Sequence, residues 1–155
     1  ILAATGDSAT AAEAVAVIER QLRQMVRLVD DLLDVSRVSR GKIALQVEPT
    51  DAAEVVRAAV ETARSLIDAA GHELTVSLPD GPLPLDVDRA RTVQVLGNLL
   101  TNAAKYTDRG GKIALVVTRE GDTAAFAVRD DGVGIPPDML TRVFDMFAQV
   151  DTSLE

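Results

Sequence analysis

Two asparagines and a lysine recur at helical spacing in the second half of the chain. Within QVLGNLLTNAAKYT (residues 94–107), Asn98, Asn102 and Lys105 occupy positions i, i+4 and i+7, so on a helix they share one face. Asparagine is a poor residue for a helix interior because its side chain competes for backbone hydrogen bonds. Amide oxygens can ligate Mg²⁺, and a lysine neutralises phosphate groups as a point charge. This Asn–Asn–Lys face therefore indicates a magnesium–phosphate site, although a solvated polar face would carry the same residues.

A second polar motif, VRDDGVGIP at residues 128–136, contains two glycines. Asp130 closes a predicted strand, where its carboxylate can accept a hydrogen bond from an exocyclic amine such as adenine N6. Gly132 and Gly134 have no Cβ, which lets a flat ring approach the backbone, and Ile135 supplies an apolar wall. Because D-D-G also forms common turns, the motif alone does not separate a binding loop from a turn.

The two motifs together predict a nucleotide pocket, with the base at one end and magnesium-bound phosphates at the other. Tyr106 directly follows the Asn–Asn–Lys face in the sequence. Of the two adjacent carboxylates, we assign Asp130 to adenine and interpret Asp131 as a solvent-facing spacer. The glycines that follow are interpreted as room for the ring and as a hinge.

Alternating polar and apolar residues predict five strands around these motifs. The last two strands flank a short glycine-containing turn, which is a hairpin signal. The predicted strands are residues 42–48, 73–78, 85–87, 112–119 and 123–130.

Helical periodicity predicts two long helices between these strands. The first is capped at residue 50 or 51 and ends at Gly71, and the second is capped by Asp88 and spans residues 89–106. A short helix over residues 137–144 follows the last strand. The apolar side of the second helix is predicted to consist of Val95, Leu96, Leu99, Leu100 and Ala103.

The first 41 residues carry a different pattern, a heptad seam that indicates one helix of a bundle. A second apolar line beside the seam makes the stripe too wide for a two-stranded zipper. Two readings stay open: an amphipathic helix packed in its own domain, or a bundle completed by upstream residues or another subunit. The second reading is favoured because residues 1–14 offer no helix strong enough to pair with this one. The seam consists of Val15, Ile18, Leu22, Met25, Val29, Leu32 and Ser36, and the second line of Val26 and Leu33.

Composition argues against several classes of partner. The chain has 155 residues, about one domain, with a net charge of −8, which disfavours nucleic acid and anionic membrane surfaces. It has no cysteine, so it has no disulfide framework, and no apolar run reaches the roughly 18 residues of a membrane span. We expect a cytoplasmic chain, whether or not a parent protein is membrane-anchored. Because the chain starts at Ile1, we expect it to be part of a longer protein.

Four segments, in order, resemble the sensor histidine kinases of two-component systems. DDLLDVSR (30–37) resembles the second helix of the dimerisation and phosphotransfer hairpin, and NLLTNAAKYT (98–107) resembles the N box. DDGVGIP (130–136) resembles the first glycine box, and VFDMFAQVD (143–151) the F box of the lid over the nucleotide. Each motif is moderately specific, and four in this order are highly specific.

The resemblance implies an α+β chain with two parts. Residues 1–41 would be a helical-hairpin segment of a four-helix bundle that forms a homodimer. Residues 42–155 would be a Bergerat-type α/β sandwich with helices on one face of a mixed sheet. The implied cofactors are ATP and Mg²⁺, the implied activity is transfer of the ATP γ-phosphoryl group to a histidine on the dimerisation helix, and the implied partner is a response-regulator receiver domain.

The resemblance also implies a role for each matched residue. It assigns Asn98 and Asn102 to Mg²⁺, Lys105 to the phosphates and Asp130 to the adenine amine. Tyr106 would lie near the sugar and phosphates.

The chain departs from the family at two points. Its single histidine, His72 in AGHELT, mimics the phosphoacceptor motif, but it follows a helix stop and leads into a strand, so we reject it as the acceptor. The acceptor is expected before Ile1, which leaves no catalytic residue in this chain. The second glycine box is expected after Glu155, so the ATP-binding domain is expected to lack its C-terminal part and the chain alone to be inactive.

Two alternative functions stay open. An ATPase of the gyrase and Hsp90 group typically carries a glutamate base one turn before the magnesium-binding asparagine. Here that position is Asn98, which cannot accept a proton at neutral pH, and this favours phosphotransfer over hydrolysis. The other alternative is a non-catalytic module for dimerisation or nucleotide sensing.

Overall fold

The computed structural model describes residues 15, 17–18, 21–22, 25 and 44–144. The chain forms two compact units, residues 1–45 and 46–155. In the first unit the described residues before position 26 are helical. The rest of the predicted heptad seam lies outside the described residues, as do residues 145–151 of the F-box motif. The described members of the seam are Val15, Ile18, Leu22 and Met25, and each is more than half exposed.

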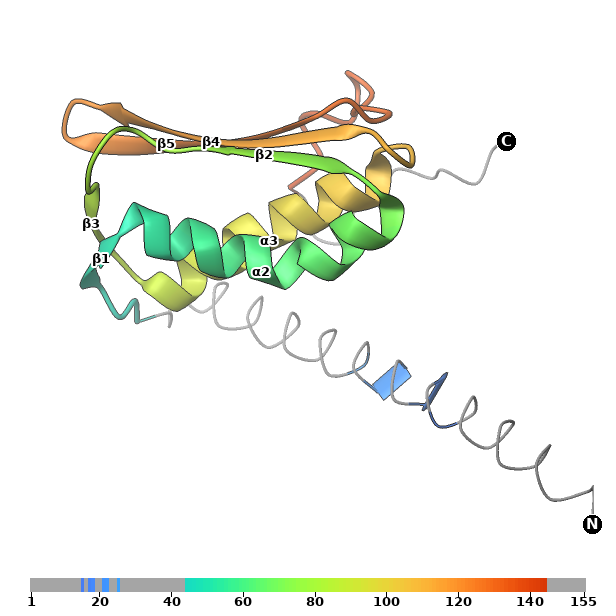
Figure 1. The fold of residues 1–155 in the computed structure, drawn as a ribbon, viewed down its shortest axis with the longest axis horizontal. Helices are drawn as coiled ribbons and strands as arrows, with labels where there is room; N and C mark the ends of the chain where they lie inside the picture. Colours follow the sequence, from blue (N-terminus) through green and yellow to red (C-terminus); the bar gives the residue numbers. More distant parts are fainter. Residues whose placement is uncertain (1–14, 16, 19–20, 23–24, 26–43, 145–155) are drawn as a thin grey trace, which may run out of the picture. The chain divides into compact units, whose positions relative to one another are not determined.

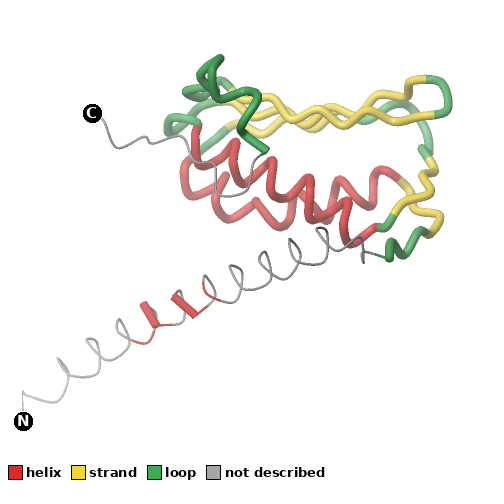
Figure 2. Tube along the Cα trace, turned by 180° about the vertical axis from the view of Figure 1, so that it is seen from behind, coloured by secondary structure: helices red, strands yellow, loops and turns green. Residues whose placement is uncertain are grey.

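The second unit has a layer of strands and a layer of helices (Figure 1, Figure 2). A three-stranded sheet has the order β2–β4–β5, with β2 and β4 parallel and β4 and β5 antiparallel. Strands β1 and β3 form a separate antiparallel pair. Helices α2 and α3 lie on one face of the mixed sheet, as the resemblance implies. The elements are β1 (Glu48–Asp51), α2 (Ala52–Ala70), β2 (Glu73–Ser77), β3 (Pro84–Val87), α3 (Arg89–Tyr106), β4 (Lys112–Glu120) and β5 (Thr123–Asp130).

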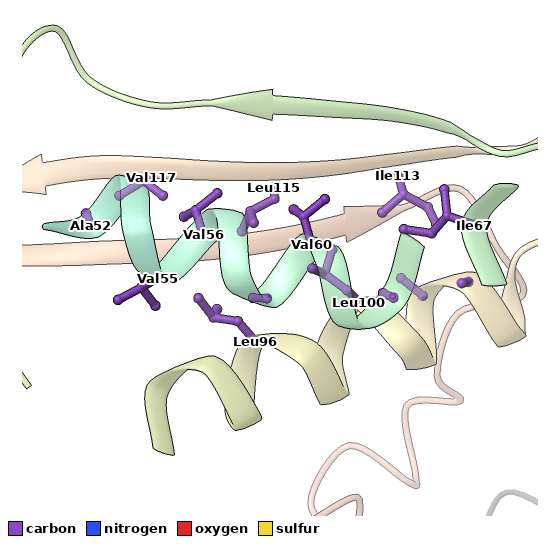
Figure 3. Packing of buried hydrophobic residues seen from close by; sticks show 14 of the residues in the cluster. Ala52, Val55, Val56, Val60, Ile67, Leu96, Leu100, Ile113, Leu115 and Val117 are labelled. Atoms are coloured by element: carbon purple, nitrogen blue, oxygen red, sulfur yellow. The ribbon is translucent and has the colours of Figure 1, made fainter. Parts of the chain in front are cut away.

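The core lies between the two layers and joins α3 to the sheet (Figure 3). Alternate residues of β4 point to the same face, and Ile113, Leu115 and Val117 are buried there. Helix α2 covers them with apolar residues at helical spacing, and α3 adds Leu96 and Leu100. Each fully buried side chain of this size stabilises the fold by about 1.5–3 kcal/mol. The buried residues of α2 are Ala52, Val55, Val56, Ala59, Val60, Ala63 and Ile67.

Each long helix begins at an aspartate cap, as predicted from the sequence. Asp51 Oδ1 accepts a hydrogen bond of 2.8 Å from the amide two residues on, and α2 ends at Gly71. Asp88 Oδ1 accepts from the Arg91 amide at 3.0 Å, and its Oδ2 accepts from the Gln46 amide at 3.0 Å. These backbone donors, that of Arg91 above all, lower the pKa of Asp88. The start of α3 is thereby fixed to the chain that precedes β1.

Residues 44–47 are not a strand, so the prediction for residues 42–48 is wrong over this stretch. Pairing starts only at Glu48, opposite Val87. Before that point the amide of Gln46 donates to the cap of α3 instead of to a strand. The alternating apolar side chains of this stretch are exposed, so the pattern there does not correspond to a buried sheet face.

Residues 137–144 form turns and not the predicted helix. The amides of Met139 and Arg142 donate to carbonyls three residues earlier, at 2.9 Å each. Two prolines at the start supply no amide hydrogen. Leu140 and Phe144 are 55% and 93% exposed, so no buried apolar face stabilises a helix here.

Candidate functional site

The side of α3 opposite the core presents the Asn–Asn–Lys face. Asn98, Asn102 and Lys105 are all exposed. Within the described residues, neither asparagine side chain pairs with another group. Two free amide groups one helical turn apart are therefore available to a ligand. The buried residues of the same helix are Leu96, Gly97, Leu100, Ala103 and Ala104.

Val95 and Leu99, which the sequence assigns to the apolar side of α3, lie on its exposed side. Val95 is 58% exposed and Leu99 42%, whereas the predicted Leu96 and Leu100 are buried. Successive residues of a helix are rotated by about 100°. Because only one stripe of α3 packs against the core, the residue directly before each buried leucine faces solvent. Apolar surface therefore borders the two asparagines.

Lys105 and Tyr106 form one polar group at the end of α3. Lys105 Nζ donates a hydrogen bond to Tyr106 Oη at 3.0 Å and lies 4.7 Å from the centroid of its ring. This arrangement combines a charge-assisted hydrogen bond with a cation–π contact. It holds the ammonium group at the same helix end that the sequence predicts to meet phosphates.

Asp130 is the last residue of β5 and pairs with Ile113 of β4. It is exposed, and its Oδ1 accepts a hydrogen bond from the Gly132 amide at 3.0 Å. A carboxylate has about four lone-pair sites on two oxygens, so acceptor capacity remains for a ligand. The strand end predicted to meet an exocyclic amine therefore carries a carboxylate fixed by its own turn.

The two motifs meet at the end of α3. The amide of Val133 donates to the carbonyl of Tyr106 at 3.1 Å. A Cβ on Gly132 would collide with that same carbonyl group. Gly132 therefore lets the loop after β5 pack against the backbone of α3. The sequence interpretation gave Gly132 only the role of making room for a flat ring and did not include this packing.

The rest of the glycine loop is open to solvent. Gly134 has φ +70°, a left-handed conformation that glycine adopts without strain, and nothing lies within 4 Å of where its Cβ would be. Ile135 follows it and is 46% exposed. The loop after β5 therefore has open space at Gly134 and an exposed apolar side chain at Ile135.

Asp131 is exposed but is not a mere spacer. Its Oδ1 accepts a hydrogen bond from the Lys112 amide at 2.7 Å, and its own amide donates to the Lys112 carbonyl at 3.3 Å. These two bonds fix the loop to the first residue of β4. The sequence pattern missed this role because the partner lies 19 positions away.

His72 is an additional polar residue at this end of α3. It is 8% exposed, and its Nε2 lies 3.0 Å from the carbonyl oxygen of Ala104. It follows α2 and precedes β2, as the sequence predicts. No local pattern reveals its partner, which is 32 residues further along the chain.

Magnesium, if bound here, would depend on amide oxygens. Among the residues that the structure describes, no three His, Cys, Asp or Glu side chains gather as a metal-binding cluster. Asn98 and Asn102 supply two hard oxygen donors, and Mg²⁺ commonly completes its shell with water and substrate phosphates. The donor set therefore fits a metal that arrives with a nucleotide.

Comparison with known proteins finds similar sequences and folds. Residues 87–155 match the family described as histidine kinase-, DNA gyrase B-, and HSP90-like ATPase, and this segment contains α3, β4, β5 and the glycine loop. Over these residues the chain is similar to that family. The circadian input-output histidine kinase CikA of Synechococcus elongatus is 38% identical over 133 residues, which are 84% of this chain and 18% of CikA. The chain thus spans less than a fifth of that kinase.

Solved histidine kinase structures share the fold of this chain. Full-length ShkA in complex with AMPPNP aligns with a TM-score of 0.74 at 27% identity, over 88% of this chain and 30% of ShkA. ThkA in complex with response regulator protein TrrA aligns with a TM-score of 0.70 at 21% identity, over 88% of this chain and 40% of that chain. In the described part of the chain, no helix has the length and apolar character of a membrane span.

Proposed function

We propose that residues 42–155 are the ATP-binding catalytic domain of a sensor histidine kinase, which delivers the γ-phosphoryl group of ATP to a histidine on a dimerisation helix. The observation that carries the proposal is the junction between the two motifs. The Val133 amide bonds to the carbonyl of Tyr106, and Gly132 packs against the same peptide group. The junction sets the strand end of Asp130 beside the helix end of Lys105.

The phosphate end of the proposed site lies along α3. Asn98 and Asn102 would hold Mg²⁺ through their amide oxygens, and the bound ion would neutralise charge on the phosphates. The ammonium group of Lys105 has three donors, and one of them serves Tyr106 Oη. Two donors remain for phosphate oxygens, so Tyr106 would orient the lysine without consuming its capacity.

The base end of the proposed site lies at the loop after β5. Asp130 would accept a hydrogen bond from the exocyclic amine of adenine, while the Gly132 amide fixes the carboxylate. Gly134 leaves open space in which a ring could lie, and Ile135 offers an apolar surface beside it. Guanine presents a carbonyl oxygen where adenine has its amine, so a carboxylate there would favour adenine.

Phosphotransfer is favoured over hydrolysis by the residue at position 98. Activation of water needs a group that takes up a proton, and the amide of Asn98 cannot do so at neutral pH. Positioning and charge neutralisation suffice for transfer to a presented acceptor. The gyrase-like ATPase alternative is therefore the weaker one.

The acceptor histidine and the partners belong to the same proposal. His72, the single histidine of the chain, is buried and bonded to a backbone carbonyl, so we place the acceptor elsewhere in the parent protein. The exposed apolar seam of the first unit supports a homodimer formed through residues 1–41. The complex of ThkA with a response regulator supports a receiver domain as the next phosphoryl acceptor, and we place this exchange in the cytoplasm.

Nucleotide binding and phosphate release together test the proposal. Calorimetric titration of the chain with Mg-AMPPNP is expected to give saturable binding. Mg-GTP is expected to bind at least about tenfold more weakly, because guanine carries a carbonyl oxygen in place of the 6-amine of adenine. Incubation with Mg-ATP is expected to release phosphate only at background rate, since no base activates water. Steady hydrolysis over many turnovers would favour the ATPase alternative, and equal binding of both nucleotides would remove the adenine assignment.

A further inference from the structure

We propose that His72 is a positioning residue for the nucleotide site, and this inference rests on the proposed function. Its side chain lies outside the Asn–Asn–Lys face and acts through the backbone. The Nε2 atom bonds the carbonyl of Ala104 at 3.0 Å, and the next residue is Lys105. The bond therefore ties the peptide group from which the phosphate-binding lysine projects.

The end of α3 is closed by groups from three different segments. The last four carbonyls of a helix have no partner inside it unless the chain beyond supplies one. The carbonyl of Ala103 accepts from the amide of the cap residue, and that of Tyr106 accepts from the Val133 amide. Between them, the carbonyl of Ala104 accepts from His72. His72 thus supplies the bond in the middle of the turn that carries the lysine and the tyrosine.

The chemistry of the ring gives this bond a fixed direction. A carbonyl oxygen can only accept, so Nε2 carries the proton and donates. The other ring nitrogen, Nδ1, is buried and has no partner among the described residues. The side chain is 8% exposed, so water does not readily replace it, and an unpaired buried carbonyl is unfavourable.

Hydrogen bonds connect the C-terminal ends of α2 and α3 in both directions. Arg109, just beyond α3, donates from Nη2 to the carbonyl of Ala69 in α2 at 3.1 Å, and the Gly110 amide donates to the carbonyl of Ala70 at 3.0 Å. His72, just beyond α2, donates to α3 in return. Removal of the histidine donor would therefore loosen the last turn of α3 while the core contacts of Leu96 and Leu100 still hold the rest of the helix.

Two substitutions of His72 separate the hydrogen bond from the packing. His72→Leu removes the donor and keeps an apolar side chain, whereas His72→Gln carries an amide N–H near the position of Nε2. Val55→Ala is the matched control, because it weakens the core at the start of α2, at the other end of the helix. Calorimetry with Mg-AMPPNP is run at a temperature at which circular dichroism shows each variant folded. We expect Kd to rise about tenfold in His72→Leu and to return to within about threefold of the unmodified chain in His72→Gln.

Hydrogen exchange of the nucleotide-free chain gives a readout that does not depend on ATP binding. In His72→Leu, the amides of residues 105–108 are expected to exchange faster than in Val55→Ala. Unchanged affinity and exchange in His72→Leu, or equal losses in Val55→Ala, would overturn the positioning role. If the unmodified chain does not bind Mg-AMPPNP, the proposed function fails, and the exchange result still decides whether His72 holds the end of α3.

Discussion

Asp130 and Asp131 are chemically identical neighbours whose surroundings differ. Asp131 bonds the Lys112 amide at 2.7 Å and belongs to the junction of β4 and β5. Among the described residues, the side chain of Asp130 bonds only the Gly132 amide within its own turn. The sequence predicts which carboxylate ends the strand, because strand alternation stops there. It does not predict the bond of Asp131, because strand register brings Lys112 to that position.

The two aspartates provide a matched pair of substitutions. Asp130→Asn places amide hydrogens where the adenine amine would donate, and a hydrogen bond to a charged group is worth about 1.5–3 kcal/mol. We expect the affinity for Mg-AMPPNP to fall by about tenfold or more. Asp131→Asn keeps an acceptor oxygen for the Lys112 amide and is expected to bind within about threefold of the unmodified chain. Calorimetry at one ionic strength compares them; if Asp130→Asn binds normally, Asp130 does not contact the base.

Asn102 is expected to make nucleotide binding depend on magnesium. Its exposed amide pairs with no described residue, so Asn102→Ala removes a ligand without breaking an internal bond. The ratio of AMPPNP affinities with Mg²⁺ and with EDTA is expected to be large in the unmodified chain and to approach one in the variant. Thr101→Ala is the control, because it alters the neighbouring position. A magnesium response retained by Asn102→Ala would remove the assignment of this residue to the metal.

At the scale of elements, local sequence signals predict where the helices start, but they do not predict the conformation of segments without a buried face. Asp51 and Asp88 cap α2 and α3 as predicted, because an N-cap depends on a single side chain and its nearest amides. The predicted strand is wrong over residues 44–47 and the predicted helix is wrong over residues 137–144, because among the described residues neither stretch buries an apolar face. Leu45, Val47, Leu140 and Phe144 are exposed instead.

The packing of the glycine loop against α3 predicts a specific effect of Gly132→Ala. Its Cβ would meet the Tyr106 carbonyl, so the loop must move away from the helix, at a cost of about 1–3 kcal/mol of unfolding free energy. We expect lower thermal stability together with weaker binding of Mg-AMPPNP, because Asp130 moves relative to Lys105. Gly121 in the β4–β5 turn has φ +63°, and nothing lies within 4 Å of where its Cβ would be. Gly121→Ala should therefore lose stability through backbone strain but bind Mg-AMPPNP normally. If Gly132→Ala binds as tightly as Gly121→Ala, the loop does not set the site geometry.

At the scale of the whole molecule, the resemblance implied the layers of the fold, whereas neither motif order nor periodicity predicted the strand order. Strand β2 pairs with β4 across the entire α3 segment, with Glu73 opposite Lys112. Periodicity describes each strand by itself, so it does not indicate which strands become neighbours. The order of the N-box and glycine-box motifs implied a known arrangement with helices on one face of a mixed sheet. The junction at Tyr106 and Val133, which unites the site, is seen only in the structure.

The first unit is predicted to join two copies of the chain. Val15, Ile18, Leu22 and Met25 share one seam and are each more than half exposed, and burial of apolar surface in a helical bundle would stabilise association. Analytical ultracentrifugation is expected to give twice the chain mass of 16.4 kDa. Ile18→Glu combined with Leu22→Glu places charge on the seam and should yield monomers that still bind Mg-AMPPNP. Changing Gln21 to glutamate, off the seam, should leave the dimer intact; a monomeric unmodified chain at high concentration would rule out dimerisation through this helix.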